Sequence, residues 1–142
     1  MIMRNMIILF SLLGMTATAH GVENPQDAKK FYEKVVQVQP GNANAQFDLG
    51  NVYLSEKRYE DALSHYKKVG NSGLASSRMD SYYFNVAVCY AGLGRMGDAV
   101  SSLEQCIRVN PNHQEARDLL AIYKNALSPP ARNQVGGGTP PE

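Results

Sequence analysis

Three alanines, Ala28, Ala62 and Ala99, occupy the same place in a repeated pattern, at spacings of 34 and then 37 residues. Pro40 and Pro111 follow the first and the last of these alanines, each by 12 residues. A period of about 34 residues that combines small residues with prolines indicates a repeated pair of helices. One such pair cannot bury its apolar face alone, so a chain of this kind builds its core by stacking pairs on one another.

The spacing of the apolar residues predicts six helices, over residues 25–38, 43–55, 59–70, 78–92, 96–108 and 113–127. Asn24 and Asn42 are expected to cap the first and the second helix, because an Asn side chain can accept a bond from the first free amides. We expect Ser77 and Asp80 to form a capping box for the fourth helix, and Asn112 to cap the sixth.

The first helix should turn an apolar stripe inward, formed by Phe31, Tyr32, Val35, Val36 and Val38. Two helices approach closely only where their side chains are small. We therefore expect Gly50 to contact Ala62, and Ala87 to contact Ala99, within the two predicted hairpins.

These positions resemble the tetratricopeptide-repeat (TPR) family. The matching residues are Leu49, Gly50, Tyr53, Tyr59, Ala62 and Tyr66 in one repeat, then Tyr83, Val86, Ala87, Tyr90, Gly94, Ala99, Leu103, Cys106 and Pro111 in the next. Gln46 departs from the family pattern, which has a bulky aromatic there, and Lys57 departs from a turn glycine. The resemblance implies an all-α helix-turn-helix solenoid of about six antiparallel helices, with two full repeats between two half-repeats.

The two ends of the chain differ in composition from the repeats. Residues 1–19 combine Arg4, an apolar run over 6–15 and small residues ending at Ala19, a pattern typical of a secretory signal peptide cleaved after Ala19. The apolar run is shorter than the roughly 20 residues that span a bilayer, although an uncleaved anchor stays an alternative. Residues 20–127 form the predicted repeat domain. Residues 128–142 are rich in Pro and Gly and are predicted to be disordered.

The signal peptide predicts a periplasmic or secreted protein. Segments 48–51 and 81–94 also resemble small secreted bacterial TPR proteins of the Bat aerotolerance type. Removal of residues 1–19 takes away only Arg4 among the charged residues and leaves 13 basic against 13 acidic side chains. A balanced chain gives no electrostatic reason to bind nucleic acid or an anionic membrane.

The family resemblance implies that a protein or extended peptide binds in a groove lined by the first helix of each repeat. The corresponding positions are Asn44, Phe47, Asp48, Asn51, Leu54, Ser81, Phe84, Asn85, Val88, Ala91, Glu115, Asp118, Leu119 and Ile122. We expect Phe47, Phe84 and Val88 to be apolar contacts outside the core. Asn51 and Asn85 are expected to bond a peptide backbone. A simpler alternative is that Phe47 and Phe84 only pack within the solenoid.

One subtype of TPR groove holds a C-terminal carboxylate with basic residues. Phe47, Glu115 and Leu119 stand at those positions here, and none of them is basic, which argues against such a clamp. A second interpretation of the chain is structural: half-repeats expose apolar edges, such as Tyr32 and Leu119, through which copies could associate.

Reactive chemistry has little support in the sequence. His65 and His113 lack metal-spaced partners and are expected on the solvated surface, whereas His20 would bind copper only as a mature N-terminus. Cys89 and Cys106 would lie about 9 Å apart along a helix pair, beyond the roughly 7 Å between Cα atoms that a disulfide allows. Two buried, unreactive thiols are favoured. We expect no catalytic residue, no cofactor and no metal site.

Overall fold

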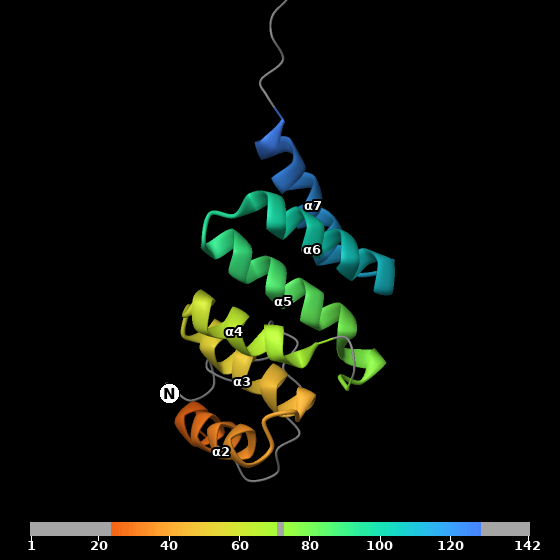
Figure 1. Cartoon of the computed structure of the whole chain (residues 1–142). Coiled ribbons are helices and arrows are strands. Elements are labelled where there is room, and N and C mark those ends of the chain that lie inside the picture. Colours follow the sequence, from red (N-terminus) through yellow and green to blue (C-terminus); the bar gives the residue numbers. More distant parts are fainter. Residues whose placement is uncertain (1–23, 71–72, 129–142) are drawn as a thin grey trace, which may run out of the picture.

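The repeated helices form a single antiparallel stack. The computed structural model describes residues 24–70 and 73–128. Its elements are α2 (Pro25–Val38), α3 (Ala43–Ser55), α4 (Tyr59–Val69), the short 3₁₀ helix η1 (Ser76–Arg78), α5 (Met79–Gly92), α6 (Met96–Val109) and α7 (Gln114–Leu127). Each α-helix packs on the one before it, from α2 at one end to α7 at the other, and α3 also contacts α5 (Figure 1). The predicted all-α solenoid is confirmed.

Two predicted segments cannot be compared with the structure. The predicted signal peptide, His20 and residues 129–142 of the predicted tail lie outside the described residues. No helix among residues 24–70 and 73–128 is both long enough and apolar enough to cross a membrane.

The caps of the first two helices are confirmed. Asn24 Oδ1 accepts from the Gln26 amide at 2.7 Å, and Asn42 Oδ1 accepts from the Ala45 amide at 3.1 Å. Each bond satisfies one of the amides that a helix start leaves free.

The capping box predicted for the fourth helix is wrong. Ser77 lies inside η1, α5 begins only at Met79, and no side chain caps that helix. Asp80 instead accepts the amide of Ser81 at 2.8 Å and the Asn110 amide group at 2.8 Å. A 3₁₀ turn thus takes the place of the predicted cap.

The cap predicted for the last helix is also wrong. His113 replaces Asn112: its Nδ1 accepts from the Ala116 amide at 3.3 Å. The Asn112 amide donates to Asn110 Oδ1 at 3.1 Å, which draws this residue into the preceding turn. His113 is half-buried rather than fully solvated, and its ring stacks on Phe84 at 4.9 Å between centroids.

Two apolar clusters form the core, and α5 belongs to both. The first joins α3, α4 and α5, and the second joins α5, α6 and α7. Ala62 and Ala99 are completely buried, as their place in the repeat predicts. The closest neighbour of Gly50 is the Tyr66 ring rather than Ala62. A Cβ added at Gly50 would lie only 2.4 Å from this ring.

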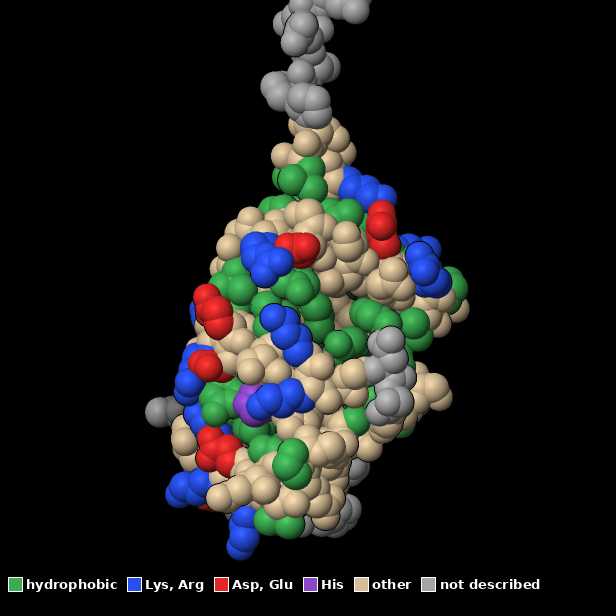
Figure 2. Space-filling model, in the orientation of Figure 1, with side chains coloured by type: hydrophobic (Ala, Val, Ile, Leu, Met, Phe, Trp, Pro, Cys, Tyr) green, Lys and Arg blue, Asp and Glu red, His purple; other side chains and the backbone are tan. Residues whose placement is uncertain are grey.

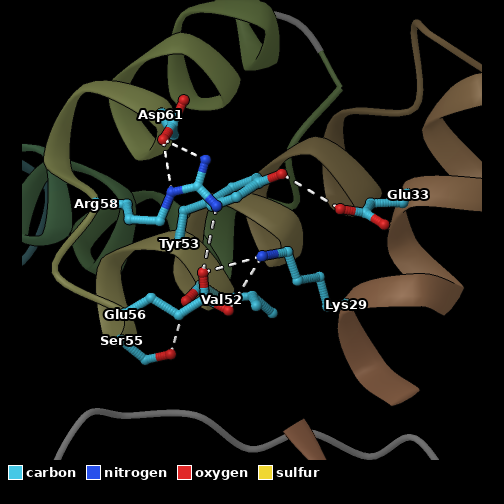
Figure 3. A network of polar contacts seen from close by, with 8 residues as sticks. All are labelled: Lys29, Glu33, Val52, Tyr53, Ser55, Glu56, Arg58 and Asp61. Atoms are coloured by element: carbon cyan, nitrogen blue, oxygen red, sulfur yellow. Dashed lines mark hydrogen bonds and ion pairs between the residues drawn. The ribbon is translucent and has the colours of Figure 1, made fainter. Parts of the chain in front are cut away.

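A repeated arginine–aspartate brace holds the start of each second helix. Arg58 Nε donates to Asp61 at 2.7 Å, and Arg95 Nε donates to Asp98 at the same distance (Figure 3 shows the first). Each guanidinium also lies 4.6 Å from the centre of a tyrosine ring of the preceding helix, Tyr53 or Tyr90. The repeated spacing Arg-x-x-Asp-Ala at 58–62 and 95–99 is a sequence signal that the helix prediction did not use.

Helix α2 contributes no buried residue to the core. The inward apolar stripe predicted for it is wrong at two positions, since Phe31 is 52% exposed and Val38 is 72% exposed. Tyr32, Val35 and Val36 are half-buried. The reason is that, among the described residues, α2 has a neighbouring helix on one side only, so they leave uncovered the face that would meet a preceding helix.

Polar contacts attach α2 to α3. Lys29 Nζ reaches both carboxylate oxygens of Glu56, at 3.0 and 3.1 Å, and lies 4.7 Å from the Tyr53 ring centre. Tyr53 Oη donates to Glu33 at 3.3 Å, so the ring lies between the two helices (Figure 3).

Candidate functional site

The predicted groove follows α3, α5 and α7, which are the alternate helices of the stack. The structure divides the predicted residues into two groups. Four of them are buried: Phe47, Asn51, Leu54 and Asn85. The others are half-buried or exposed.

Asn51 and Asn85 do not face a ligand, which corrects the prediction for both. They are 7% and 5% exposed, and Asn51 Oδ1 accepts from Asn85 Nδ2 at 2.9 Å. Tyr66 Oη donates to the same oxygen at 2.7 Å, and burial raises the pKa of this phenol well above 10.0. Buried amides need partners, and here they find them in each other and in Tyr66. This network ties α3, α4 and α5 together.

Phe47 and Leu54 also belong to the core, although the sequence predicted them to line the groove. Phe47 is 2% exposed, and its ring lies 5.8 Å from that of Tyr66 and 6.3 Å from that of Tyr82. The guanidinium of Arg78 covers this ring, 4.5 Å from its centre. Residues at the start of the next repeat, Arg78 and Tyr82, therefore help to bury Phe47, which the α3–α4 hairpin alone would leave exposed.

Arg78 is a site residue that sequence reasoning missed. It comes from η1, donates to Asn44 Oδ1 at 3.2 Å and pairs with the carboxylate of Asp48. Asp48 is thus half-buried and already neutralised, so it is not a free acceptor on this face. No spacing signal marks Arg78, because it follows a Gly/Ser-rich connection of irregular length.

The remaining predicted residues lie on α3, α5 and α7. We call them the α3–α5–α7 face, formed by Asn44, Asp48, Ser81, Phe84, Val88, Ala91, Glu115, Asp118, Leu119 and Ile122. Phe84, Val88 and Leu119 are half-buried, whereas Ile122 is 59% exposed. Glu115 and Asp118 are exposed on α7, and Asp118 accepts from Gln114 at 2.8 Å. The face combines an apolar centre with an acidic margin.

The two thiols are buried and free, which confirms the preferred prediction. Burial raises the pKa of Cys89 to about 12 and that of Cys106 to about 11, so both are protonated at neutral pH. A protonated, buried thiol is a poor nucleophile and a poor metal ligand. Among the described residues, no three His, Cys, Asp or Glu side chains gather in a way that could hold a metal ion.

His65 is not on the solvated surface as predicted. It is half-buried, its Nδ1 lies 2.8 Å from Gln46 Oε1, and its ring stacks on Tyr53 at 5.2 Å. Burial, and then the charge of Lys68, lower its pKa below 6.5. Gln46, which stands where the family has a bulky aromatic, also donates to the Pro40 carbonyl at 2.9 Å and so replaces apolar packing with hydrogen bonds.

Charge is mixed over the surface. On the side drawn in Figure 2, basic and acidic side chains are interspersed from α2 to α7.

Comparison with known proteins points to one family. Tetratricopeptide-repeat profiles match residues 19–81 and 80–113. The chain is 28% identical over 112 residues to anaphase-promoting complex subunit 7 of Arabidopsis thaliana, covering 77% of this chain and 19% of that protein. It is 29% identical over 94 residues to Hsp70-Hsp90 organizing protein 2 of the same plant, covering 66% of this chain and 16% of that protein. The chain thus spans a fifth or less of the length of these relatives.

Solved structures share the fold. A MamA double mutant superposes with a TM-score of 0.64 at 19% identity, over 86% of this chain and 62% of that one. A mutant O-GlcNAc transferase of Thermobaculum terrenum gives a TM-score of 0.63 at 19% identity, over 87% of this chain and 23% of that one. At this identity the likeness concerns the helical solenoid alone.

Proposed function

This chain belongs to the tetratricopeptide-repeat family, and we propose that it is a non-catalytic adaptor that holds a protein or an extended peptide on its α3–α5–α7 face. Its relatives support the broader role of a protein-interaction scaffold. The observation that carries the proposal is the position of Phe84, Val88 and Leu119, which are half-buried apolar side chains on adjacent first helices. Partly exposed apolar groups with a polar surround are typical of a contact site.

The acidic margin favours a particular kind of ligand. Glu115 and Asp118 are exposed beside the apolar centre, and Arg78 is already paired with Asp48. A segment with one apolar side chain followed by a basic residue would satisfy both parts of the face. A free C-terminal carboxylate would meet acidic groups instead. The relatives named as Hsp70-Hsp90 organizing proteins therefore do not lead us to propose a chaperone-tail clamp here.

We place this activity in the bacterial envelope, on the basis of the sequence of residues 1–19. The mass of the protein exported from its native host tests this part alone. A mature N-terminus at His20 supports it, and an intact Met1 in the cytosolic fraction contradicts it.

The binding proposal is tested by affinity capture from the native envelope fraction with three proteins. These are the wild type, an Ile122→Ser/Asp118→Lys variant on the face, and a Val109→Ser/Glu60→Lys variant that makes matched exchanges elsewhere. Ile122 and Val109 are both exposed hydrophobic residues, and Asp118 and Glu60 are both exposed acidic residues. We expect the face variant to lose the captured protein by about tenfold or more, since truncation of a hot-spot contact costs about 2 kcal/mol or more.

The matched control should retain the same partner as the wild type. Equal thermal unfolding of the three proteins shows that the fold is unchanged. Equal capture by the two variants would contradict the α3–α5–α7 face as the binding site. Asn51 and Asn85 are unsuitable for this test. Replacing Asn51 would leave the Tyr66 hydroxyl without its buried acceptor, and replacing Asn85 would remove the buried amide that donates to Asn51 Oδ1.

A second candidate function is self-association through the half-repeats. Phe31 and Val38 on α2, and Leu127 on α7, are more than half exposed at the two ends of the stack. The edge residues named from the sequence, Tyr32 and Leu119, are only half-buried. A mass that rises with protein concentration would support this function, and a constant one-chain mass would contradict it.

A further inference from the structure

The two ends of the stack are complementary halves of a repeat. In the full repeats, α3 is followed by its partner α4, and α5 by α6. By position, α7 corresponds to the first helix of a pair, because Ala121 stands where Gly50 and Ala87 stand. Helix α2 corresponds to the second helix, because Ala28 stands where Ala62 and Ala99 stand.

A repeated contact confirms that α7 sits on its neighbour as a first helix does. Tyr53 of α3 donates to Glu33 of α2 at 3.3 Å, across 20 residues of chain. Lys124 of α7 pairs with Glu104 of α6 at 2.7 Å, and their numbers also differ by 20. We infer that α7 of one copy packs on α2 of a second copy, as α3 packs on α4, so that two half-repeats complete one repeat in trans.

The small residues show which surfaces are unfilled. In the full repeats they are buried: Gly50, Ala87, Ala62 and Ala99. The equivalent residues at the ends are less buried, since Ala28 is half-buried and Ala121 is exposed. Small side chains at these points allow the close approach of two helices, so the missing neighbour leaves a ready contact on each end.

The chain after α7 is a poor source of the missing helix. In the register of the repeat, Gly137 stands where Tyr66 and Leu103 fill the core, and Gly136 and Gly138 flank it. Asn133 stands where Ala62 and Ala99 stand. Glycine is among the weakest helix formers, and this stretch offers no large side chain at the core position. This sequence favours a second molecule as the source of the helix that completes α7.

The exposed side chains at the two ends also suit each other. In the full repeat, His65 of α4 bonds to Gln46 and stacks on Tyr53, both from α3. The equivalent residues are Phe31 on α2, and Arg117 and Lys124 on α7. An aromatic ring would thus meet two cations, an arrangement that is favourable when the ring face is otherwise open to water. This accounts for an exposed Phe31 on a helix that has no buried residue.

Ala121 is one methyl larger than Gly50, whose backbone touches the Tyr66 ring. The corresponding ring in the joined pair is Tyr32. Ala87 stands at the same position of the next full repeat and is 1% exposed there, so this step of the repeat accommodates an alanine methyl group.

Joining unlike ends has a consequence for assembly. A head-to-tail contact leaves a free α2 on one copy and a free α7 on the other, so it extends into a chain of copies unless a ring closes. The inference rests on the second candidate function, and it is independent of peptide binding on the α3–α5–α7 face.

The test uses protein expressed from the full-length gene, with its N-terminus identified by mass spectrometry. Variants are Ala121→Arg, which blocks α7, Ala28→Arg, which blocks α2, and Ala75→Arg, the same exchange at an exposed residue away from both ends. Sedimentation velocity is measured from about 5 to about 500 µM, where mass action reveals weak association. We expect the average mass of the wild type and of Ala75→Arg to rise with concentration.

We expect each end variant to keep a one-chain mass when alone. An equimolar mixture should form a species of two chains and no larger one, because each variant retains the end that the other lacks. Circular dichroism and thermal unfolding verify the fold of each variant. A monomeric wild type, an unchanged association of either end variant, or a mixture that stays monomeric would overturn the inference.

Capture of an envelope partner by the Ala121→Arg variant reports on the first candidate function separately. Failure of one proposal is thereby distinguishable from failure of the other.

Discussion

Lys57 adopts a backbone conformation that suits glycine. Its φ is 59°, and Gly94, at the equivalent position of the next repeat, has φ 73°. The left-handed region costs a residue with a Cβ about 1 kcal/mol or more, whereas glycine enters it freely. The departure from the family pattern at this position is therefore a point of local strain.

We predict that Lys57→Gly raises the free energy of unfolding by about 1 kcal/mol, because it removes this strain. Urea unfolding followed by circular dichroism measures the change. The reverse exchange, Gly94→Lys, should lower stability by a similar amount. Equal midpoints for Lys57→Gly and the wild type would show that the turn holds no strain.

His65 makes the stability of the fold depend on pH. Its pKa in the folded chain is lowered from 6.5 by burial and by Lys68, so the folded state disfavours the protonated ring. The stability that neutral His65 contributes is fully present above the pKa of this ring in the unfolded chain. It is lost as pH falls through the lower pKa of the ring in the folded chain. We expect the melting temperature to fall more steeply between about pH 7 and pH 5 than in a His65→Phe variant.

His65→Phe keeps the aromatic stack on Tyr53 and removes the titrating group. The carboxylates are common to both proteins, so the difference between their pH profiles reports on His65. Parallel profiles would contradict this role of the ring.

At the scale of elements, α2 depends on polar contacts where the other helices depend on burial. Lys29 joins Glu56 and lies over the Tyr53 ring, and α2 has no buried residue. Partly exposed ion pairs contribute about 1 kcal/mol or less, and salt screens them. Helix α2 should thus open more readily than α3, to which it is attached.

We predict that Lys29→Ala raises amide hydrogen exchange of residues 25–38 by a few fold and leaves the exchange of α5 unchanged. Lys30→Ala is the matched control, because Lys30 is exposed and adjacent. High salt should reproduce the effect in the wild type. The interpretation fails if both variants exchange alike.

For the molecule as a whole, the two core clusters share α5. Within residues 24–70 and 73–128, the outer helices α2 and α7 each have a neighbouring helix on one side of the stack only. We predict that α5 and its partners α4 and α6 exchange amide hydrogens most slowly, and that α2 and α7 exchange fastest. Exchange measured by mass spectrometry at low protein concentration, where copies do not join, gives the order. Protection of α7 equal to that of α5 would contradict it.

At high protein concentration, head-to-tail joining should protect α2 and α7 and leave the middle of the stack unchanged. The Ala121→Arg variant provides the control, since its α7 end is blocked. Protection that appears equally in this variant would point to a contact other than the two ends.

The helices, their order and most of their boundaries followed from local signals: the 3.6-residue apolar period, the caps Asn24 and Asn42, and the repeated small residues. Such signals act between residues a few positions apart, so the sequence alone determined them. Only the tertiary structure decided which polar and aromatic side chains face outward. Asn51 and Phe47 lie on α3, and Asn85 lies on α5. Asn51 and Asn85 are nevertheless buried in a network with Tyr66 of α4, and Phe47 is covered by Arg78 of η1. That outcome depends on the packing of one hairpin on the next, a contact between residues far apart in the chain.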